Sequence, residues 1–369
     1  MPDGYDAVKV QTQFVQPSTV GTQYGVPLII GTATGYETAE ILYYNTYSSL
    51  ISVFTSDVSP AIYKCAEALN NNGVNQIAVG VYKDSISELY PLIAAEARTH
   101  SITSLVVAGF TLDSTTLTKI VPEEGESLID VCDENDVIAV IVATPPNGDG
   151  TITPTTITQL VESISSRNVY FFAHNDPTVT TDIGGAVLGT IEMLAPQVTP
   201  QWKPVVCDID TYFNNYDVQT LEASQVNTII LDYGLSASFT TQLQSAVPTP
   251  NDNNDVITDI SITRSIYSIR TSIQLAIINL RKNTTKLGYT NTSLGLIRAT
   301  IETTLEDELE STNNTMGMIS DYDIEMPTLN DISADDRAKG ILRNVIISVT
   351  LTGEIKTFIF SLVVDLGGS

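Results

Sequence analysis

Side chains that commonly do chemistry are scarce in this sequence. The chain of 369 residues contains only two histidines, His100 and His174, which leaves almost no scope for a histidine-based metal site or a catalytic triad. It also lacks a Gly-x-Ser-x-Gly motif, in which a strained turn exposes a nucleophilic serine. The residue types therefore predict that the protein is not an enzyme and holds no metal or cofactor.

Three short motifs have the residue types of a ligand site, but each lacks a required part. Gly31-Thr-Ala-Thr-Gly35 follows an apolar run, without the Gly-Lys-Ser/Thr ending of a phosphate-binding loop or the third glycine of the dinucleotide fingerprint. Asp208-Ile-Asp210 has the spacing of a metal-binding acid pair, without a nucleotide-sugar signature. Asn251–Asp255 lacks the distal glutamate of a calcium loop. We interpret the first as a tight turn and the last as a solvated linker.

The elements that would position these motifs alternate between strand and helix over residues 26–235, which predicts an α/β region. The segment Ser59–Asn70 has an N-cap serine, then Pro60 at the first helical position, and apolar residues at helical spacing. It is therefore predicted to be a helix. Strands are predicted at Val26–Ile30, Gln76–Val81, Ser104–Ala108, Val137–Ala143, Asn168–Ala173 and Thr228–Leu231.

The Pro- and Asn/Asp-rich segment Val247–Asp255 is the best domain boundary. We expect an arm and linker at residues 1–25, an α/β outer region at 26–250 with a further division near 110–235 as an option, and a C-terminal domain at 251–369. The last domain should begin with a strand at Ile260–Thr263 and continue with two amphipathic helices. Their apolar stripes are Ile266, Ile269, Ile273, Ile277 and Leu280 in the first helix and Ile297, Ile301, Leu305 and Leu309 in the second.

The end of the chain predicts a β-hairpin whose second strand is longer than its partner. Asn344–Leu351 alternates apolar and polar side chains, and Thr352-Gly353 suits a two-residue turn. This turn would place Ile347 opposite Phe358. Residues 361–366 continue in strand-like composition beyond the end of the first strand, so their backbone groups need another edge.

The start of the chain shows a similar pattern. Tyr5–Val15 alternates apolar and polar side chains, and Pro17–Gly25 separates it from the next apolar run, so we interpret it as a detachable arm. If the terminal strands pair with a neighbouring copy, the protein is a polymer subunit built by strand addition. The alternative is that both strands pair inside their own domain.

The charge is strongly negative and uneven. The net charge is −26, with 7 basic and 29 acidic residues up to position 256 but 10 and 14 after it. An acidic outer layer and a nearly neutral inner layer of an assembly would explain this difference, and adaptation to high salt is another explanation. No basic stripe predicts nucleic-acid binding, and no apolar run of ~18 residues predicts membrane insertion. The acidic start differs from a signal peptide, so we expect a soluble protein made in the cytoplasm.

Taken in order, these segments resemble the contractile tail sheath proteins of myovirus-type phages and related injection machines. The strongest resemblance runs from Ile260 to Leu366, through the break at Arg281-Lys-Asn283 and the segment Ser333–Leu342 that precedes the hairpin. In the first half, Val26–Ala33 and Ser59–Val81 are similar to the first βαβ unit of the family. Before Trp202 this chain has Gln201, where the family tends to have glycine.

The resemblance implies an α/β and α+β fold, with an α/β region, a sheath-type domain of two helices and a β-hairpin, and extended terminal arms. It implies a structural subunit that polymerises around an inner tube by strand exchange and contracts to drive the tube through a cell envelope. The implied partners are other copies, the inner tail tube protein, and the baseplate and tail terminator proteins, in a virion tail assembled in the host cytoplasm. The exchanged arms would use Val8, Val10, Phe14, Phe358, Phe360, Leu362 and Val364.

The family also meets its tube through charges of the C-terminal domain, which makes Arg337, Lys339 and Arg343 candidates for facing the tube. Local salt bridges with Asp335 or Asp336 are the alternative role for these three residues. Two other classes of protein remain open. One is an acidic α/β enzyme or ligand-binding protein, and the other is a different assembly protein, such as a surface-layer or capsid component.

Overall fold

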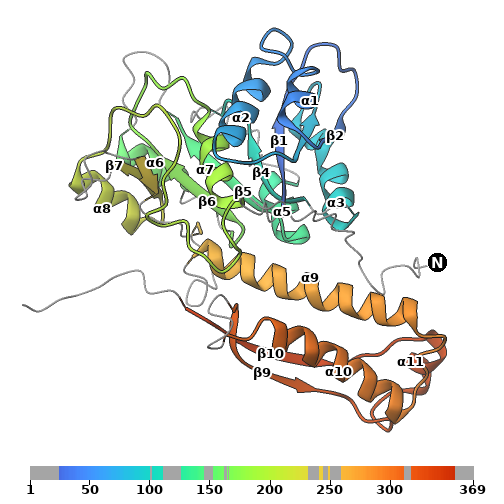
Figure 1. Ribbon diagram of the computed structural model, residues 1–369. Helices are drawn as coiled ribbons and strands as arrows, with labels where there is room; N and C mark the ends of the chain where they lie inside the picture. The colour runs from blue at the N-terminus through green and yellow to red at the C-terminus, as the bar shows by residue number, and fades with distance from the viewer. Residues whose placement is uncertain are drawn as a thin grey trace, which may run out of the picture.

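The computed structural model describes residues 25–99, 102–110, 126–144, 153–161, 164, 166–231, 241–243, 248–249, 259–310 and 317–353. Figure 1 shows a large α/β body, formed by the described residues up to 249, and a small domain, formed by those from 259 onward. The long helix α9 (Ile260–Asn283) lies between the two. The expected combination of an α/β region with a helix-and-strand C-terminal part is confirmed.

The body is built on one sheet with the strand order β2-β3-β1-β4-β5-β6-β7-β8. The six inner strands are parallel, while β2 and β8 run antiparallel at the two edges. Each strand predicted in this region is present within a few residues of its expected bounds. The strands are β1 Val26–Gly31, β2 Glu40–Tyr44, β3 Ile77–Val81, β4 Ile102–Val107, β5 Ile138–Ala143, β6 Val169–Ala173, β7 Asn227–Leu231 and β8 Thr241–Leu243.

Helices cover both faces of this sheet, because its inner strands are almost wholly apolar and must be buried on both sides. One face packs against η1 (Ile86–Leu89), α3 (Tyr90–Thr99), α5 (Leu128–Asn135), α6 (Pro154–Val161) and α8 (Asn215–Ala223). The other packs against α1 (Tyr47–Ile51), α2 (Pro60–Asn71) and α7 (Ile183–Glu192). In the described part of the chain, no helix is both long enough and apolar enough to cross a bilayer.

Helices α2 and α7 approach each other closely because α7 presents glycines to α2. A Cβ atom on Gly185 would lie 2.6 Å from the backbone oxygen of Cys65, and one on Gly189 would lie 2.8 Å from the side chain of Asn72. The helix predicted at Ser59–Asn70 is confirmed. Ser59 does not cap it with its side chain, because the hydroxyl donates to the backbone oxygen of Thr32 at 2.7 Å.

The small domain packs α9 and α10 (Asn291–Asp307) against a two-stranded sheet of β9 (Ile319–Glu325) and β10 (Ile346–Leu351), with α11 (Ala334–Lys339) at one end. Its core contains the stripe predicted for the second helix, namely Ile297, Ile301 and Leu305 of α10 and Leu309 just after it, together with Ile269, Ile273 and Ile277 of α9. The predicted inward position of Ile266 is wrong, because its side chain is 38% exposed.

The strand predicted at Ile260–Thr263 is also wrong, since these residues form the first turn of α9. Their β-branched side chains favour a strand, but the N-cap overrides this preference. The carboxylate of Asp259 accepts hydrogen bonds from the Ser261 backbone nitrogen at 2.8 Å and from the Ser261 hydroxyl at 2.6 Å, which satisfies a backbone donor that a helix start leaves free.

Candidate assembly surface

The two-stranded sheet of the small domain has one apolar face and one polar face. Strands β9 and β10 are antiparallel, with Ile347 opposite Ile324 and Val349 opposite Tyr322, and these residues belong to the core with α9 and α10. Because side chains alternate along a strand, the residues between them point away from the helices. Those residues include Asp321 and Asp323 of β9, both exposed.

This sheet has little strand pairing beyond its own two strands. In the part of the chain that the structure describes, β9 is joined on its other side only at its start, where Ile319 donates its backbone N–H to Glu308 at 3.1 Å and accepts from Glu310 at 2.7 Å. A two-stranded sheet is marginal by itself in water, and further strands stabilise it. The small domain therefore has room for added strands along the edges of its sheet.

The predicted second strand of the hairpin and both terminal arms lie outside the described residues. This holds for the front positions Val8, Val10 and Phe14 and for the back positions Phe358, Phe360, Leu362 and Val364. The first hairpin strand is present as β10. The residue that follows it, Thr352, is fixed against the start of β9, since its hydroxyl donates to the Gly317 backbone oxygen at 2.8 Å.

The three cations that we expected to face a tube are engaged locally at α11. Lys339 forms an ion pair with Asp335 at 2.7 Å, Arg343 forms one with Asp336 at 2.9 Å, and Arg337 donates to the backbone oxygen of Leu329. Hydrogen bonds from Arg343 and from Ser333 lower the pKa of Asp336 below its ordinary value. The local salt bridges that formed the alternative role for these residues are therefore present.

A second group of cations, which was not among the predicted site residues, lies close to α11. Arg281 and Lys282 end α9, and Lys286 follows in the loop to α10. All three are exposed and form no ion pair with any residue that the structure describes. The loop is held to the α11 segment by Tyr289, whose hydroxyl lies 3.2 Å from the Asp336 oxygen and 3.1 Å from the Ile341 oxygen. The absence of any acidic residue from 260 to 301 is the signal that could have found this group.

The first third of α9 is embedded in the α/β body and joins it to the small domain. Ile260 is fully buried in the body's core, and the Tyr170 and Thr263 hydroxyls are 2.8 Å apart. Arg264, which is 8% exposed, donates to the Leu194 backbone oxygen at 2.8 Å.

Farther along the helix, Arg270 and Arg167 both form ion pairs with Asp136. Helix α9 contains neither proline nor glycine, the usual causes of a kink, so one unbroken helix connects the body to the small domain.

The glycine motif that begins at Gly31 contributes to the packing of the body. Doubly wound sheets bind ligands beyond the carboxyl ends of their strands at the topological switch point, where the strand order reverses. In this sheet the switch point lies between β1 and β4. A Cβ atom on Gly31 would lie 2.7 Å from the Ile62 side chain, and one on Gly109 would lie 3.1 Å from Ala61. Helix α2 therefore packs directly over this point.

Asp208, Asp210 and His174 take part in hydrogen bonds that hold loops of the body. Burial by itself would raise the pKa of Asp208, but hydrogen bonds from Thr180 and Thr181 outweigh it and hold that pKa below its ordinary value. Burial lowers the pKa of His174 to about 4. Its Nδ1 accepts from the Asp176 backbone nitrogen at 3.3 Å. In the described residues, no group of three or more His, Cys, Asp or Glu side chains is arranged to hold a metal ion.

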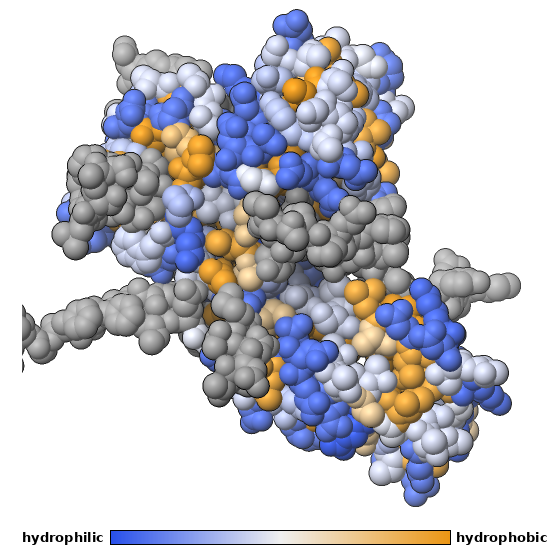
Figure 2. All heavy atoms as spheres, viewed as in Figure 1, coloured by the Kyte–Doolittle hydropathy of each residue, from blue (hydrophilic) through white to orange (hydrophobic). Residues whose placement is uncertain are grey.

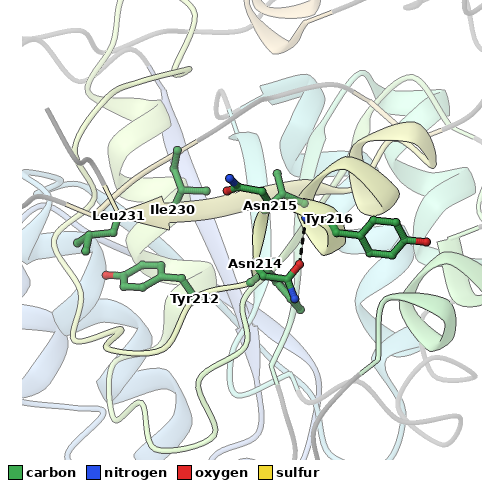
Figure 3. A pocket seen from close by; sticks show the side chains of 8 residues that line it. Tyr212, Asn214, Asn215, Tyr216, Ile230 and Leu231 are labelled. Atoms are coloured by element: carbon green, nitrogen blue, oxygen red, sulfur yellow. Dashed lines mark hydrogen bonds between the residues drawn. The ribbon is translucent and has the colours of Figure 1, made fainter.

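One cavity of about 600 Å³ lies beside β7 and the start of α8, lined by Tyr212, Phe213, Asn214, Asn215, Tyr216, Val218, Ile230 and Leu231 (Figure 3). Tyr216 extends away from it and is 77% exposed. The Asn214 side chain caps α8 by accepting from the Tyr216 and Asp217 backbone nitrogens, each at 3.0 Å. The lining thus contains no carboxylate, amine or imidazole, and the amide oxygen of Asn214 is already engaged as the cap of α8.

The whole chain is similar in structure to contractile sheath proteins. A chain of the anti-feeding prophage baseplate is 14% identical with a TM-score of 0.68, and the similarity covers 96% of this chain and 97% of that one. The helical sheath of the same particle in its contracted state is 14% identical with a TM-score of 0.65, covering 95% and 96%. The sheath tail protein of Listeria innocua is 7% identical with a TM-score of 0.54, covering 94% and 97%.

At the level of sequence, no family model and no curated protein matches the chain. The structural similarity covers both the α/β body and the small domain, since each comparison spans more than nine-tenths of both chains. The protein therefore has the fold of contractile tail sheath proteins.

Proposed function

We propose that this protein is a structural subunit of a contractile tail sheath, and not an enzyme. It polymerises around an inner tube, and contraction of the polymer drives the tube through a cell envelope. The observation that carries the proposal is the near full-length similarity to sheath and baseplate chains of a contractile particle. The packing of α2 over the usual ligand position of the body also speaks against the enzyme alternative.

The subunits are linked by strand exchange through the terminal arms. The arms would extend the β9–β10 sheet of a neighbour, which has few strand partners of its own. The apolar side chains of each arm would lie on the sheet face that covers α9 and α10. Burial of four such side chains contributes very roughly 6–12 kcal/mol before ordering costs, enough to keep a tether closed while the subunits move.

The partners are other copies, the inner tube protein, and the baseplate and terminator proteins, and the location is the tail of the particle. Arg337, Lys339 and Arg343 remain proposed as tube-facing residues. Each would have to exchange its local contact for one with the tube, which limits how much affinity it can add.

The strand-exchange proposal is tested by deleting residues 361–369. Because the α/β body contains none of these residues, we expect a folded protein that sediments as a monomer, whereas the full chain forms polymers. A full-length protein with Leu362 and Val364 both changed to Lys serves as the matched variant, since it keeps the chain length. Normal polymers from the deletion variant would contradict strand exchange by the C-terminal arm.

A further inference from the structure

The end of α9 is a cationic surface in a protein that is otherwise strongly acidic. We call Arg281, Lys282 and Lys286 the basic end. Six basic residues and no acidic residue lie between positions 260 and 301, and two of the six, Arg264 and Arg270, are used in the joint with the body. The residues of the basic end have no such intramolecular role among the described residues, so their charges are available to a partner.

The outer face of β9 carries the opposite charge to the basic end. Asp321, Asp323 and Glu325 stand at alternate positions of β9, and all three are exposed. Across the sheet, Ile346 lies opposite Glu325 and is 54% exposed. We call these four residues the acidic face. An exposed isoleucine beside three carboxylates is a surface that suits a protein partner, because an apolar side chain gives nothing to a small cation.

The two surfaces cannot neutralise each other within one molecule. The acidic face points away from the helices, since the alternate residues Ile324, Ile347 and Val349 are packed in the core with them. The basic end lies on the helix layer, where α9 meets the α11 segment (Figure 1). The sheet and its core therefore separate the two charged surfaces.

We propose that the basic end of one copy docks on the acidic face of a second copy. The contact rests on the proposed function, since it joins neighbouring subunits of the polymer, but it uses surfaces other than the exchanged arms. Two different patches meet in it, so it is a heterologous contact, the type that produces rings or helical filaments. A net charge of −26 disfavours a nucleic acid or an anionic membrane as the partner, because the rest of the molecule would repel either one.

The hydropathy of the surface agrees with a contact between proteins. Figure 2 shows hydrophobic residues that reach the surface of the small domain among hydrophilic ones. Among the residues of this domain that the structure describes, the exposed large apolar side chains are Ile266, Leu296 and Ile346. Of these, Ile346 is part of the acidic face, where a neighbour would cover it.

The test is a charge swap in the full-length protein. One variant carries R281E and K282E, a second carries D321K and D323K, and a third carries all four changes. Self-association is measured by sedimentation equilibrium at one ionic strength, about 0.15 M. A variant with K83E and K203E makes the same change in net charge as the first but places it on the α/β body, and circular dichroism verifies that every variant is folded.

We expect each double reversal to weaken self-association about tenfold or more, because it replaces attraction by repulsion, and the fourfold variant to recover most of the loss. The control should associate like the wild type. The contact would be overturned if both double-reversal variants associated like the wild type, or if the folded fourfold variant did not recover self-association. It would also be overturned if the control lost as much self-association as the double reversals, or if the wild type stayed monomeric. Normal polymers from every variant would overturn only this contact and would leave the sheath proposal standing.

Discussion

The α/β body and the small domain satisfy their backbone and charged groups in different ways. In the body, a sheet of eight strands is buried between helices, and its edge strand β8 is joined on its outer side at Leu243, which accepts from the Trp202 backbone N–H at 2.7 Å and donates to the Lys203 oxygen at 3.2 Å. Within its described residues, the small domain has a sheet of two strands, with the acidic face on one side and the basic end at the C-terminus of α9 and in the loop after it. Asp136 of the body is paired with two arginines, whereas the basic end of the small domain forms no ion pair with any described residue and its acidic face is exposed.

Helix α9 joins the two regions, because different parts of it pack in each core. The first turns of α9 belong to the packing of the body through Ile260, Thr263 and Arg264, while Ile269, Ile273 and Ile277 belong to the small domain's core. A single helix without proline or glycine therefore takes part in the packing of both regions.

Acid should destabilise the α/β body through His174, which is buried in it. The pKa of His174 is about 4 in the folded protein but near 6.5 when unfolded, so the unfolded chain binds more protons between these values. Folding stability from this group is complete above pH 6.5 and is lost as the pH falls toward 4. We expect about 2 kcal/mol of unfolding free energy to be lost between pH 7 and pH 5.

The measurement is urea unfolding followed by the fluorescence of Trp202, the single tryptophan of the chain, which lies in the body. The H174N variant keeps an acceptor for the Asp176 backbone nitrogen and should lack this part of the pH dependence. An equal loss of stability in the variant would show that His174 is not responsible.

The same substitution, Gly to Ala, should have opposite effects on stability in the two regions. Gly185→Ala in α7 should destabilise the protein by about 1–3 kcal/mol, since the new Cβ would lie 2.6 Å from the Cys65 oxygen. Gly295→Ala in α10 meets nothing within 4 Å and should stabilise its helix by about 0.5–1 kcal/mol. Thermal unfolding of both variants compares them, and a shift of the same sign would mean that the two helices are packed alike.

The smallest effect is expected at α11. The ion pairs of Lys339 and Arg343 are largely exposed, and exposed pairs contribute about 0.2–1 kcal/mol each. Changing both residues to Ala should therefore alter the unfolding free energy by less than about 2 kcal/mol, as measured by urea denaturation. A larger loss would make the α11 segment a structural element of the small domain rather than a surface available to a tube.

Much of the fold could be predicted from the sequence because the body's strands are continuous apolar runs. Such runs as Ile138–Ala143 and Val169–Ala173 are buried on both faces and stand out clearly. Strand β2 and helix α7 were not predicted. The sequence Ile183–Glu192 is apolar all round, so it has no helical periodicity to recognise.

Less of the assembly surface could be predicted, because charge type says nothing about pairing. For Lys339 and Arg343, the sequence left two roles open, contact with a tube or a local salt bridge, and only the structure shows that the pairs with Asp335 and Asp336 form. Arg281 and Lys282 were interpreted only as part of the break between two helices, because basic residues suit the C-terminus of any helix. Strand β9 was missed as well, since its outer face carries Asp and Glu, which strands usually avoid.

Negative-stain electron microscopy of the concentrated full-length protein, in ordinary buffer and in molar salt, would show directly whether the protein forms a sheath-type polymer. A subunit whose small domain is completed by its neighbours should form hollow tubes with regular helical striations in at least one of the two conditions. Flat lattices, closed shells, or dispersed monomers that bind a nucleotide or sugar would contradict the sheath proposal.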